Sequence, residues 1–272
     1  MATRERLDVL VWQRGLASSR TQAHAFILAG QIAVNGEKST RAGTLIALEA
    51  TVTRLGAPSP YVSRGGEKLA AALTAFDVVA QQCVAMDVGA STGGFTDCLL
   101  QAGASRVYAV DVGYGQLHWR LRTDPRVIVH ERTNARYLQP AQVPEPIDVL
   151  TVDASFISLR LLLPALVPLL TPKAESVVLI KPQFEVGKGQ VGKRGVVRDP
   201  HQHQQVLWEV LTAVQAGGFG VQGAMASPLL GPQGNREFLA HLRLGAEPMA
   251  SQVLHDLCNM VACGVTSQQR EP

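Results

Sequence analysis

A glycine-rich turn at residues 87–95, Asp-Val-Gly-Ala-Ser-Thr-Gly-Gly-Phe, carries the clearest chemical signal in this chain. The apolar residues 83–86 before it predict a buried strand, and residues 96–103 after it predict a helix that ends on a glycine. Glycines let a ligand approach the backbone, and the first turn of a helix leaves N–H groups free to face that ligand. This order of elements is typical of sites for nucleotide-like ligands.

The spacing of the glycines and two nearby acids narrow the ligand. Gly89 and the pair Gly93-Gly94 give Gly-x-x-x-Gly-Gly, which is not the G-x-G-x-x-G pattern of a dinucleotide site. Asp87 precedes the first glycine, and Asp111 ends the next predicted strand, where a carboxylate can accept both ribose hydroxyls. This combination suits an adenosine with a cationic tail, which describes S-adenosylmethionine. The alternative is a turn whose glycines serve packing alone.

Four charged residues, far apart in the sequence, form a second candidate site. Asp153 and Lys181 each end a predicted strand, and ligands of parallel sheets bind beyond the carboxyl ends of the strands. Glu237 begins the last predicted strand and would reach the same edge if that strand ran antiparallel. Lys68 lies on the helix leading into the first strand and could reach over the same edge. We expect the four to share one pocket; the alternative is an ordinary ion-pair network in which Lys68 is solvated.

Two lysines and two carboxylates can be partly buried together because their charges balance. Desolvation and a neighbouring cation favour the neutral form of a lysine, and a neutral amine can take a proton from a ribose hydroxyl. The hydroxyl oxygen can then attack a sulfonium methyl group in line, with most of the acceleration coming from alignment. The four residues therefore predict methyl transfer to a ribose oxygen.

The elements that must position these residues alternate between strands and helices. Such alternation predicts an α/β fold with a parallel sheet covered on both faces. Two prolines, Pro164 and Pro168, are expected to break or kink one of the helices. Strands are predicted at 83–86, 107–112, 127–130, 147–153, 177–181, 220–227 and 237–244, and helices at 67–76, 96–103, 116–122, 159–170, 201–216 and 251–261.

The first 54 residues predict a separate small module with two helices and a β-hairpin that turns at Asn35-Gly36. A further strand is expected over residues 44–53. Residues 1–68 hold nine Lys and Arg against five Asp and Glu, so this end of the chain is basic and suits a polyanion. The alternative is a solvated basic face. The candidate phosphate contacts are Arg4, Arg6, Arg14, Ser19, Arg20, Lys38 and Arg41.

Four segments of the chain are expected. Residues 1–54 form the small domain, and residues 55–66, with two prolines and three glycines, form a linker. Residues 67–244 form the large domain, and residues 245–272 form a C-terminal extension. Residues 187–194 nearly spell an ATP phosphate loop, but Arg194 stands where Ser or Thr must hold Mg²⁺. A mobile basic loop over an RNA site is the expectation there.

Seven segments of the chain carry recognisable motifs: 63–69, 87–95, 109–116, 153–158, 180–185, 227–229 and 234–238. Together they resemble the TlyA family, often labelled haemolysin A, whose members are ribosomal RNA 2′-O-methyltransferases related to the FtsJ/RrmJ group. The N-terminal pattern also resembles the small RNA-binding domain of the ribosomal-protein-S4 type, so the resemblance covers residues 4–244. Ala154 is a small departure, since valine is expected there.

The resemblance implies a class I S-adenosylmethionine-dependent methyltransferase domain of Rossmann-like fold behind a small α+β RNA-binding domain. It implies a catalytic tetrad of Lys68, Asp153, Lys181 and Glu237. The implied substrate is a cytidine 2′-hydroxyl in 23S and perhaps 16S ribosomal RNA, on ribosomal subunits. The implied cofactor contacts, joined by Asp87 from the residue analysis, are Gly89, Ala90, Ser91, Thr92, Gly93, Gly94, Phe95, Asp111, Val112 and Asn134.

The composition excludes several other classes. Hydrophobic residues make up 46% of the chain and charged residues 17%, so a sizeable core is expected. No run approaches about 18 apolar residues, and four cysteines without ligand spacing predict free thiols rather than metal binding. We expect a cytoplasmic monomer without metal. Two other functions stay open: a membrane-active haemolysin, and an RNA-binding ribosome-assembly factor without catalysis.

Overall fold

The computed structural model describes residues 3–17, 19–28, 30–55, 59–186, 192 and 195–264. The chain divides into two compact units, Met1–Pro58 and Ser59–Pro272, each of which is described by itself. The expected basic loop at 187–194 lies outside the described residues, apart from Gly192.

The first unit packs two helices against short antiparallel strands around a small core that includes Leu7, Val11, Ile27 and Ile32. The Asn35-Gly36 turn joins β2 to β3 with both residues at positive φ, which confirms the predicted hairpin. One expectation was wrong: residues 44–53 hold no single strand, because β4 pairs with β1 while β5 pairs with β2. The elements are β1 (Arg4–Arg6), α1 (Leu7–Gln13), α2 (Arg20–Leu28), β2 (Ile32–Val34), β3 (Glu37–Ser39), β4 (Leu45–Ala47) and β5 (Val52–Arg54).

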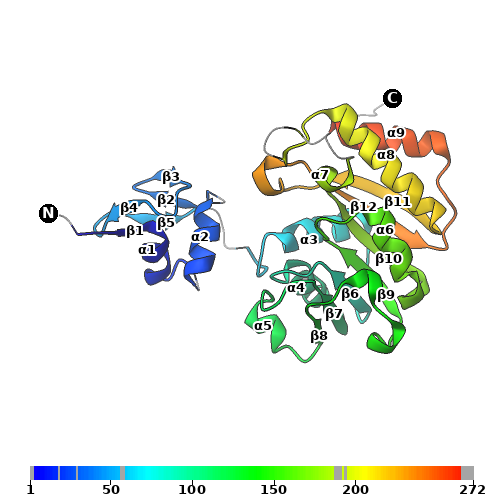
Figure 1. The fold of residues 1–272 in the computed structure, drawn as a ribbon, viewed down its shortest axis with the longest axis horizontal. Helices are drawn as coiled ribbons and strands as arrows, with labels where there is room; N and C mark the ends of the chain where they lie inside the picture. The colour runs from blue at the N-terminus through cyan, green and yellow to red at the C-terminus, as the bar shows by residue number, and fades with distance from the viewer. Residues whose placement is uncertain are drawn as a thin grey trace. The chain divides into compact units, whose positions relative to one another are not determined.

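The second unit is built on a seven-stranded sheet of order β11-β12-β10-β9-β6-β7-β8 (Figure 1). The strands from β10 to β8 in this order run parallel, whereas β12 is antiparallel to both β10 and β11. This confirms the predicted α/β class. The strands are β6 (Val84–Val88), β7 (Arg106–Val110), β8 (Val127–His130), β9 (Ile147–Val152), β10 (Leu170–Ile180), β11 (Phe219–Ala226) and β12 (Phe238–Leu244).

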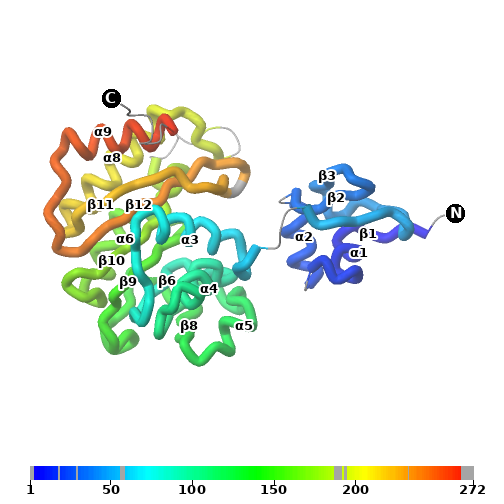
Figure 2. Tube along the Cα trace, turned by 180° about the vertical axis from the view of Figure 1, so that it is seen from behind, coloured from blue at the N-terminus to red at the C-terminus, as the bar shows by residue number. Residues whose placement is uncertain are grey.

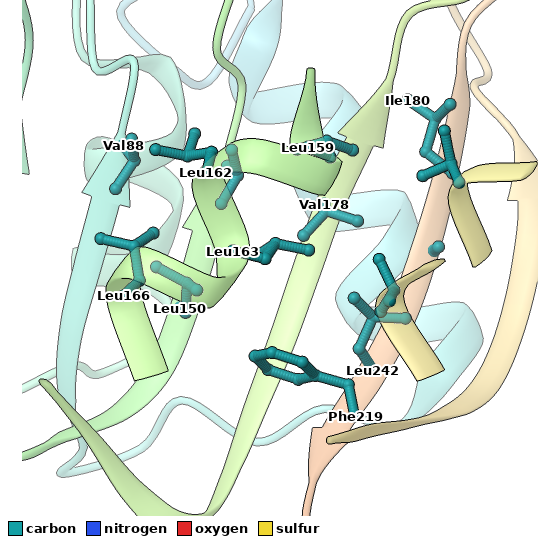
Figure 3. Close-up of a cluster of buried hydrophobic side chains, with 14 of the residues drawn as sticks. Val88, Leu150, Leu159, Leu162, Leu163, Leu166, Val178, Ile180, Phe219 and Leu242 are labelled. Carbon is teal, nitrogen blue, oxygen red and sulfur yellow. The ribbon is translucent and has the colours of Figure 1, made fainter. Parts of the chain in front are cut away.

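Helices cover both faces of this sheet (Figures 1 and 2). Alternate residues of β10 point to opposite faces. Val178 and Ile180 join a core with α6, α8 and α9 (Figure 3). Val177 and Leu179 join a core with α3 and α4 on the other face. The helices are α3 (Gly65–Phe76), α4 (Gly94–Gln101), α5 (Trp119–Arg122), α6 (Leu159–Leu166), α7 (Pro182–Glu185), α8 (Pro200–Ala216) and α9 (Ser251–Cys263), with 3₁₀ turns η1 (Ala135–Tyr137), η2 (Pro140–Gln142), η3 (Val167–Leu169) and η5 (Pro232–Gly234).

Several boundaries differ from those expected. The helix predicted over 159–170 stops at Leu166, two residues after Pro164, and continues as η3. Residues 61–64, expected in a linker, lie on the second unit, where the Val62 N–H donates to Asp97 Oδ2 at 2.8 Å. Helix α9, in the expected C-terminal extension, packs on α8 and β11 and contributes Leu254 and Cys258 to the core.

Candidate active site

The antiparallel strand β12 explains how four distant charges meet. Its first residue, Phe238, pairs with Ile180 at the end of β10, so Glu237 and Lys181 emerge side by side at one sheet edge. Asp153 follows the neighbouring strand β9, whose register with β10 places Val152 opposite Val178. Lys68 reaches this edge from the first turn of α3. All four side chains line one cavity, as the strand directions require.

The four charges form two ion pairs. Lys68 Nζ lies 2.5 Å from Glu237 Oε2, and the two side chains are 12% and 0% exposed. Lys181 Nζ lies 2.7 Å from Asp153 Oδ1, and these side chains are 10% and 25% exposed. Such burial is tolerated because each charge has an opposite partner. The remaining oxygen of Glu237, Oε1, is buried and has no hydrogen-bond partner among the described residues.

Lys181 is held in place by more than one contact. Its Nζ donates to the Asp153 carbonyl at 3.3 Å and to Ser155 Oγ at 3.0 Å. The Asp153 Oδ1 atom is close to the ammonium but lacks an aligned hydrogen bond, so the attraction between them is ionic. The amine is therefore directed by the loop that follows β9.

The cavity that these residues share has a volume of about 280 Å³. Beyond the four charges it is lined by the glycine turn, by the start of α3 and by the loop before β12. The lining contains Ser63, Arg64, Gly65, Lys68, Gly89, Ala90, Ser91, Thr92, Gly94, Phe95, Asp153, Lys181, Leu230, Gly231 and Glu237.

Close contacts around the turn require its glycines. A Cβ atom on Gly89, where φ is +85°, would lie 2.6 Å from the Asp153 carbonyl oxygen, so glycine lets the turn meet the loop after β9. A Cβ atom on Gly94 would lie 2.2 Å from Ser63 Oγ and 2.9 Å from the Gly66 nitrogen. The turn is thereby packed against both β9 and α3.

Asp87 holds the glycine turn in place through hydrogen bonds to the start of α4. Its carboxylate is fully buried, and Oδ2 accepts hydrogen bonds from the Thr96 N–H at 2.9 Å and the Thr96 hydroxyl at 2.7 Å. Burial raises the pKa of Asp87 to about 7, against the opposing effect of the Thr96 hydrogen bonds. Asp87 and Gly93, both predicted as ligand contacts, lie outside the cavity linings described here. Asp87 instead satisfies an N–H group of the first turn of α4.

A second cavity of about 280 Å³ adjoins the first and shares Gly89, Ser91 and Asp153 with it. Asp111 lies in its wall, where Oδ2 accepts from the Ser91 N–H at 2.8 Å and Oδ1 accepts from the Gly113 N–H at 2.6 Å. The predicted Val112 and Asn134 also line it. The full lining is Val88, Gly89, Ser91, Val110, Asp111, Val112, Gln116, Thr133, Asn134, Ala135, Asp153, Ala154, Ser155, Phe156, Ile157 and Leu162.

The second cavity offers residue types that suit an adenosine. Val112 and Phe156 are 71% and 90% exposed, which leaves apolar surface for a purine. The Asp111 carboxylate still has lone pairs for ribose hydroxyls. Two non-glycine residues of the lining, Ser91 and Phe156, have φ of 48° and 65°. Left-handed backbone of this kind is strained and clusters at functional sites.

Sequence reasoning missed part of both linings. Ser155 and Phe156 follow the predicted Asp153, and Ser63 and Arg64 precede the predicted Lys68, within segments that carry the family resemblance. Leu230 and Gly231 are harder to foresee, because only the fold brings the loop before β12 against the cavity.

The seven polar residues predicted to contact RNA are all exposed on the first unit. Asp8, itself buried, binds Arg6 and Arg20, each with Nε 3.0 Å from a carboxylate oxygen. Arg14 donates from Nη1 to the Ala50 carbonyl at 2.7 Å, which ties α1 to the loop after β4. Ser19 Oγ accepts from the Gln22 N–H at 3.1 Å. Arg4, Lys38 and Arg41 form no ion pair with the described residues, so their charges face outward.

Among the residues that the structure describes, no group of three or more His, Cys, Asp or Glu side chains is arranged to hold a metal ion. Among the helices of those residues, none has both the length and the apolar composition to cross a membrane.

Comparison with known proteins places the chain. The FtsJ-like methyltransferase family model matches residues 61–244, and the S4 domain model matches residues 5–52. The 16S/23S rRNA (cytidine-2′-O)-methyltransferase TlyA of Mycobacterium tuberculosis is 47% identical over 89% of this chain and 91% of its own length. Hemolysin A of Brachyspira hyodysenteriae is 40% identical over 87% and 98%.

A solved structure from Streptococcus thermophilus that bears a hemolysin name shares 41% identity, with a TM-score of 0.76 over 96% of both chains. Sequence and structure thus agree over nearly the whole length. The chain belongs to the FtsJ-like methyltransferases, in the group of the TlyA and hemolysin A proteins, and carries an S4 domain ahead of the methyltransferase domain.

Proposed function

We propose that this chain uses S-adenosylmethionine to methylate the 2′-hydroxyl of a cytidine in ribosomal RNA. The observation that carries the proposal is the pair of adjoining cavities. One is suited to an adenosine, the other holds two lysine–carboxylate pairs, and the two share Gly89, Ser91 and Asp153.

The second cavity is the proposed cofactor site. Asp111 accepts the ribose hydroxyls, and Val112 and Phe156 contact the adenine. When bound, S-adenosylmethionine supplies a methyl group on a positively charged sulfur. Since Asp153 lines both cavities, the methionine end of the cofactor is proposed to extend past it, toward the lysine pairs.

The first cavity is the proposed site of the target nucleotide. Lys181 is the proposed base that takes the proton from the 2′-hydroxyl, and Asp153, whose Oδ1 lies 2.7 Å from Nζ, holds the amine in place. Glu237, whose charge Lys68 balances, lines the same cavity and is proposed to help hold the nucleotide. The enclosing residues chiefly align the reacting oxygen.

RNA is the proposed substrate class because an S4 domain precedes the catalytic unit. Its outward charges suit contacts with phosphate groups, which position an RNA without reading its sequence. The TlyA relative bears the name of a 16S/23S rRNA cytidine 2′-O-methyltransferase, so a cytidine of ribosomal RNA is the specific expectation. We propose that the RNA is presented on ribosomal subunits. Because the proposed substrate is ribosomal RNA, the proposed location is the cytoplasm. We also propose that the protein acts as a monomer without a bound metal ion.

The test compares an alanine substitution of Lys181, which follows strand β10, with one of Lys173, which lies on that strand. Lys181→Ala should bind S-adenosylmethionine in calorimetry with about wild-type affinity, yet transfer labelled methyl groups to purified ribosomal subunits at least about 100-fold more slowly. Lys173→Ala, on the exposed part of β10, is the matched control and should behave as wild type. Undiminished transfer by Lys181→Ala would overturn the assignment. Dye leakage from lipid vesicles, absent under this proposal, would favour the haemolysin alternative.

A further inference from the structure

Glu185 is a buried carboxylate that neither cavity uses. It ends α7, four residues after Lys181, and its side chain is only 3% exposed. Its Oε2 accepts a hydrogen bond from Ser158 Oγ at 2.6 Å, and its Oε1 accepts one from the Leu159 N–H at 2.8 Å. Burial raises its pKa, with the two hydrogen bonds acting in the opposite direction. A buried acid of this kind calls for a structural or functional reason.

The partners of Glu185 lie on the other catalytic loop. Ser158 caps α6 and comes five residues after Asp153, whereas Glu185 follows Lys181. One carboxylate therefore joins the loop after β9 to the loop after β10. The Phe156 and Phe184 rings, with centroids 4.8 Å apart, and the Lys181–Ser155 hydrogen bond of 3.0 Å join the same two loops.

Arg160 also links the loop after β9 to the loop after β10. Its Nη2 donates to the Glu185 carbonyl at 3.2 Å, and its Nε donates to Ser158 Oγ at 3.2 Å. Its Nε lies 3.7 Å from the Glu185 carboxylate, and its Nη1 lies 3.5 Å from Glu209 on α8. Glu209 thus shares the arginine with Glu185, but among the described residues it forms no hydrogen bond or ion pair with either catalytic loop, which makes it a matched control.

We propose that Glu185 is a positioning residue that fixes the loop of Asp153 to Phe156 against the loop of Lys181. This proposal rests on the proposed function. We call the contacts of Glu185 with Ser158 and Leu159 the clamp. The clamp fixes the distance between Asp153 and Lys181 in the first cavity. It also holds Phe156 in the lining of the second cavity. A single substitution should therefore weaken cofactor binding and slow methyl transfer together.

The experiment uses the full chain, at a temperature at which thermal unfolding shows each variant to be more than about 95% folded. Glu185→Ala should lower kcat by about 10- to 100-fold, since a misplacement of about 1 Å can have that effect. It should also weaken S-adenosylmethionine binding in calorimetry several-fold, while KM for ribosomal subunits changes less than about 2-fold because the S4 domain is untouched. Glu185→Gln keeps the shape and an acceptor for the Leu159 N–H but removes the charge that faces Arg160, so it should show smaller but measurable losses of both properties. Glu209→Ala should match wild type.

Two results would overturn the clamp: a folded Glu185→Ala with wild-type cofactor affinity and rate, or an equal loss in Glu209→Ala. If Glu185→Ala does not fold, Glu185→Gln decides, because an unchanged rate and affinity together with an unchanged melting temperature would show that the carboxylate holds nothing. Cofactor affinity is measured without RNA, so the clamp is tested even if the wild type methylates no ribosomal subunit. That outcome would count against the proposed function alone.

Discussion

The two units of this chain hold their charges in opposite ways. In the first unit, Asp8 is buried beneath Arg6 and Arg20, whose side chains stay 45% and 53% exposed. In the second unit, the two lysines and two acids that form the ion pairs of the first cavity are no more than 25% exposed and are paired one to one. The exposed arginines of the first unit can attract a polyanion such as RNA. The buried, balanced ion pairs of the second unit can instead act on a single hydroxyl group in an enclosed cavity.

The same contrast appears in two buried aspartates. The Arg6 guanidinium, helped by Arg20, lowers the pKa of Asp8 to about 2, in spite of an opposing contribution from burial. Among the described residues no cation pairs with Asp87, and burial raises its pKa to about 7. Neighbouring charge decides the first case and desolvation the second. Substitutions in each unit test this difference.

The largest effect is expected in the second unit. Glu237→Ala leaves Lys68 nearly buried without its partner, and breaking a buried ion pair in this way costs about 3 kcal/mol or more. Denaturant unfolding should show that loss. Arg20→Ala in the first unit should change the unfolding free energy far less, because its ion pair is half exposed. Equal losses would mean that the two units do not differ in how they hold charge.

A smaller effect concerns pH. The unfolded chain loses the Asp87 proton near its ordinary pKa of 3.8, whereas the folded protein keeps it until about pH 7. The folded state therefore binds more protons in this window, and its stability falls as pH rises through it. Asp87→Asn removes this titration, so its stability relative to wild type should improve by about 1 kcal/mol or more between pH 5 and pH 8. A constant difference at both values would contradict the raised pKa.

The smallest effect is on RNA affinity. Arg20→Ala should weaken binding of ribosomal RNA a few-fold and reduce the slope of log affinity against log salt concentration by about one, as expected for one lost phosphate contact. Cofactor affinity should stay at the wild-type value, because Arg20 belongs to the other unit. Filter binding at several salt concentrations would check this. An unchanged salt slope would show that Asp8 already neutralises Arg20.

The sequence predicted the main elements of the second unit because its strands and helices are long and end in glycines or charges. It also predicted the four charges at one edge, on the condition that the last strand ran antiparallel, which β12 does. Strand β1 escaped prediction because three residues, Arg4–Arg6, are too short for a periodic pattern and are defined by pairing with β4.

The roles of Asp87 and Glu185 were harder to predict for a different reason. Each carboxylate is defined by a partner that only the fold supplies: Thr96 across a glycine turn, and Ser158 at a distance of 27 residues. Local sequence shows that an acid is present near a site, but it does not show whether that acid faces the ligand or the chain. Asp87 was predicted to face the ligand and instead holds the start of α4.

The most direct test of the account is to locate the transferred methyl group. Ribosomal subunits that lack the modification would be incubated with the protein and isotope-labelled S-adenosylmethionine, and the RNA would be digested and mapped by mass spectrometry. With the wild type, label is expected on the ribose oxygen of a cytidine, and with Lys181→Ala it should appear there at least about 100-fold more slowly. Label on a base, or the same label with the variant, would contradict the account.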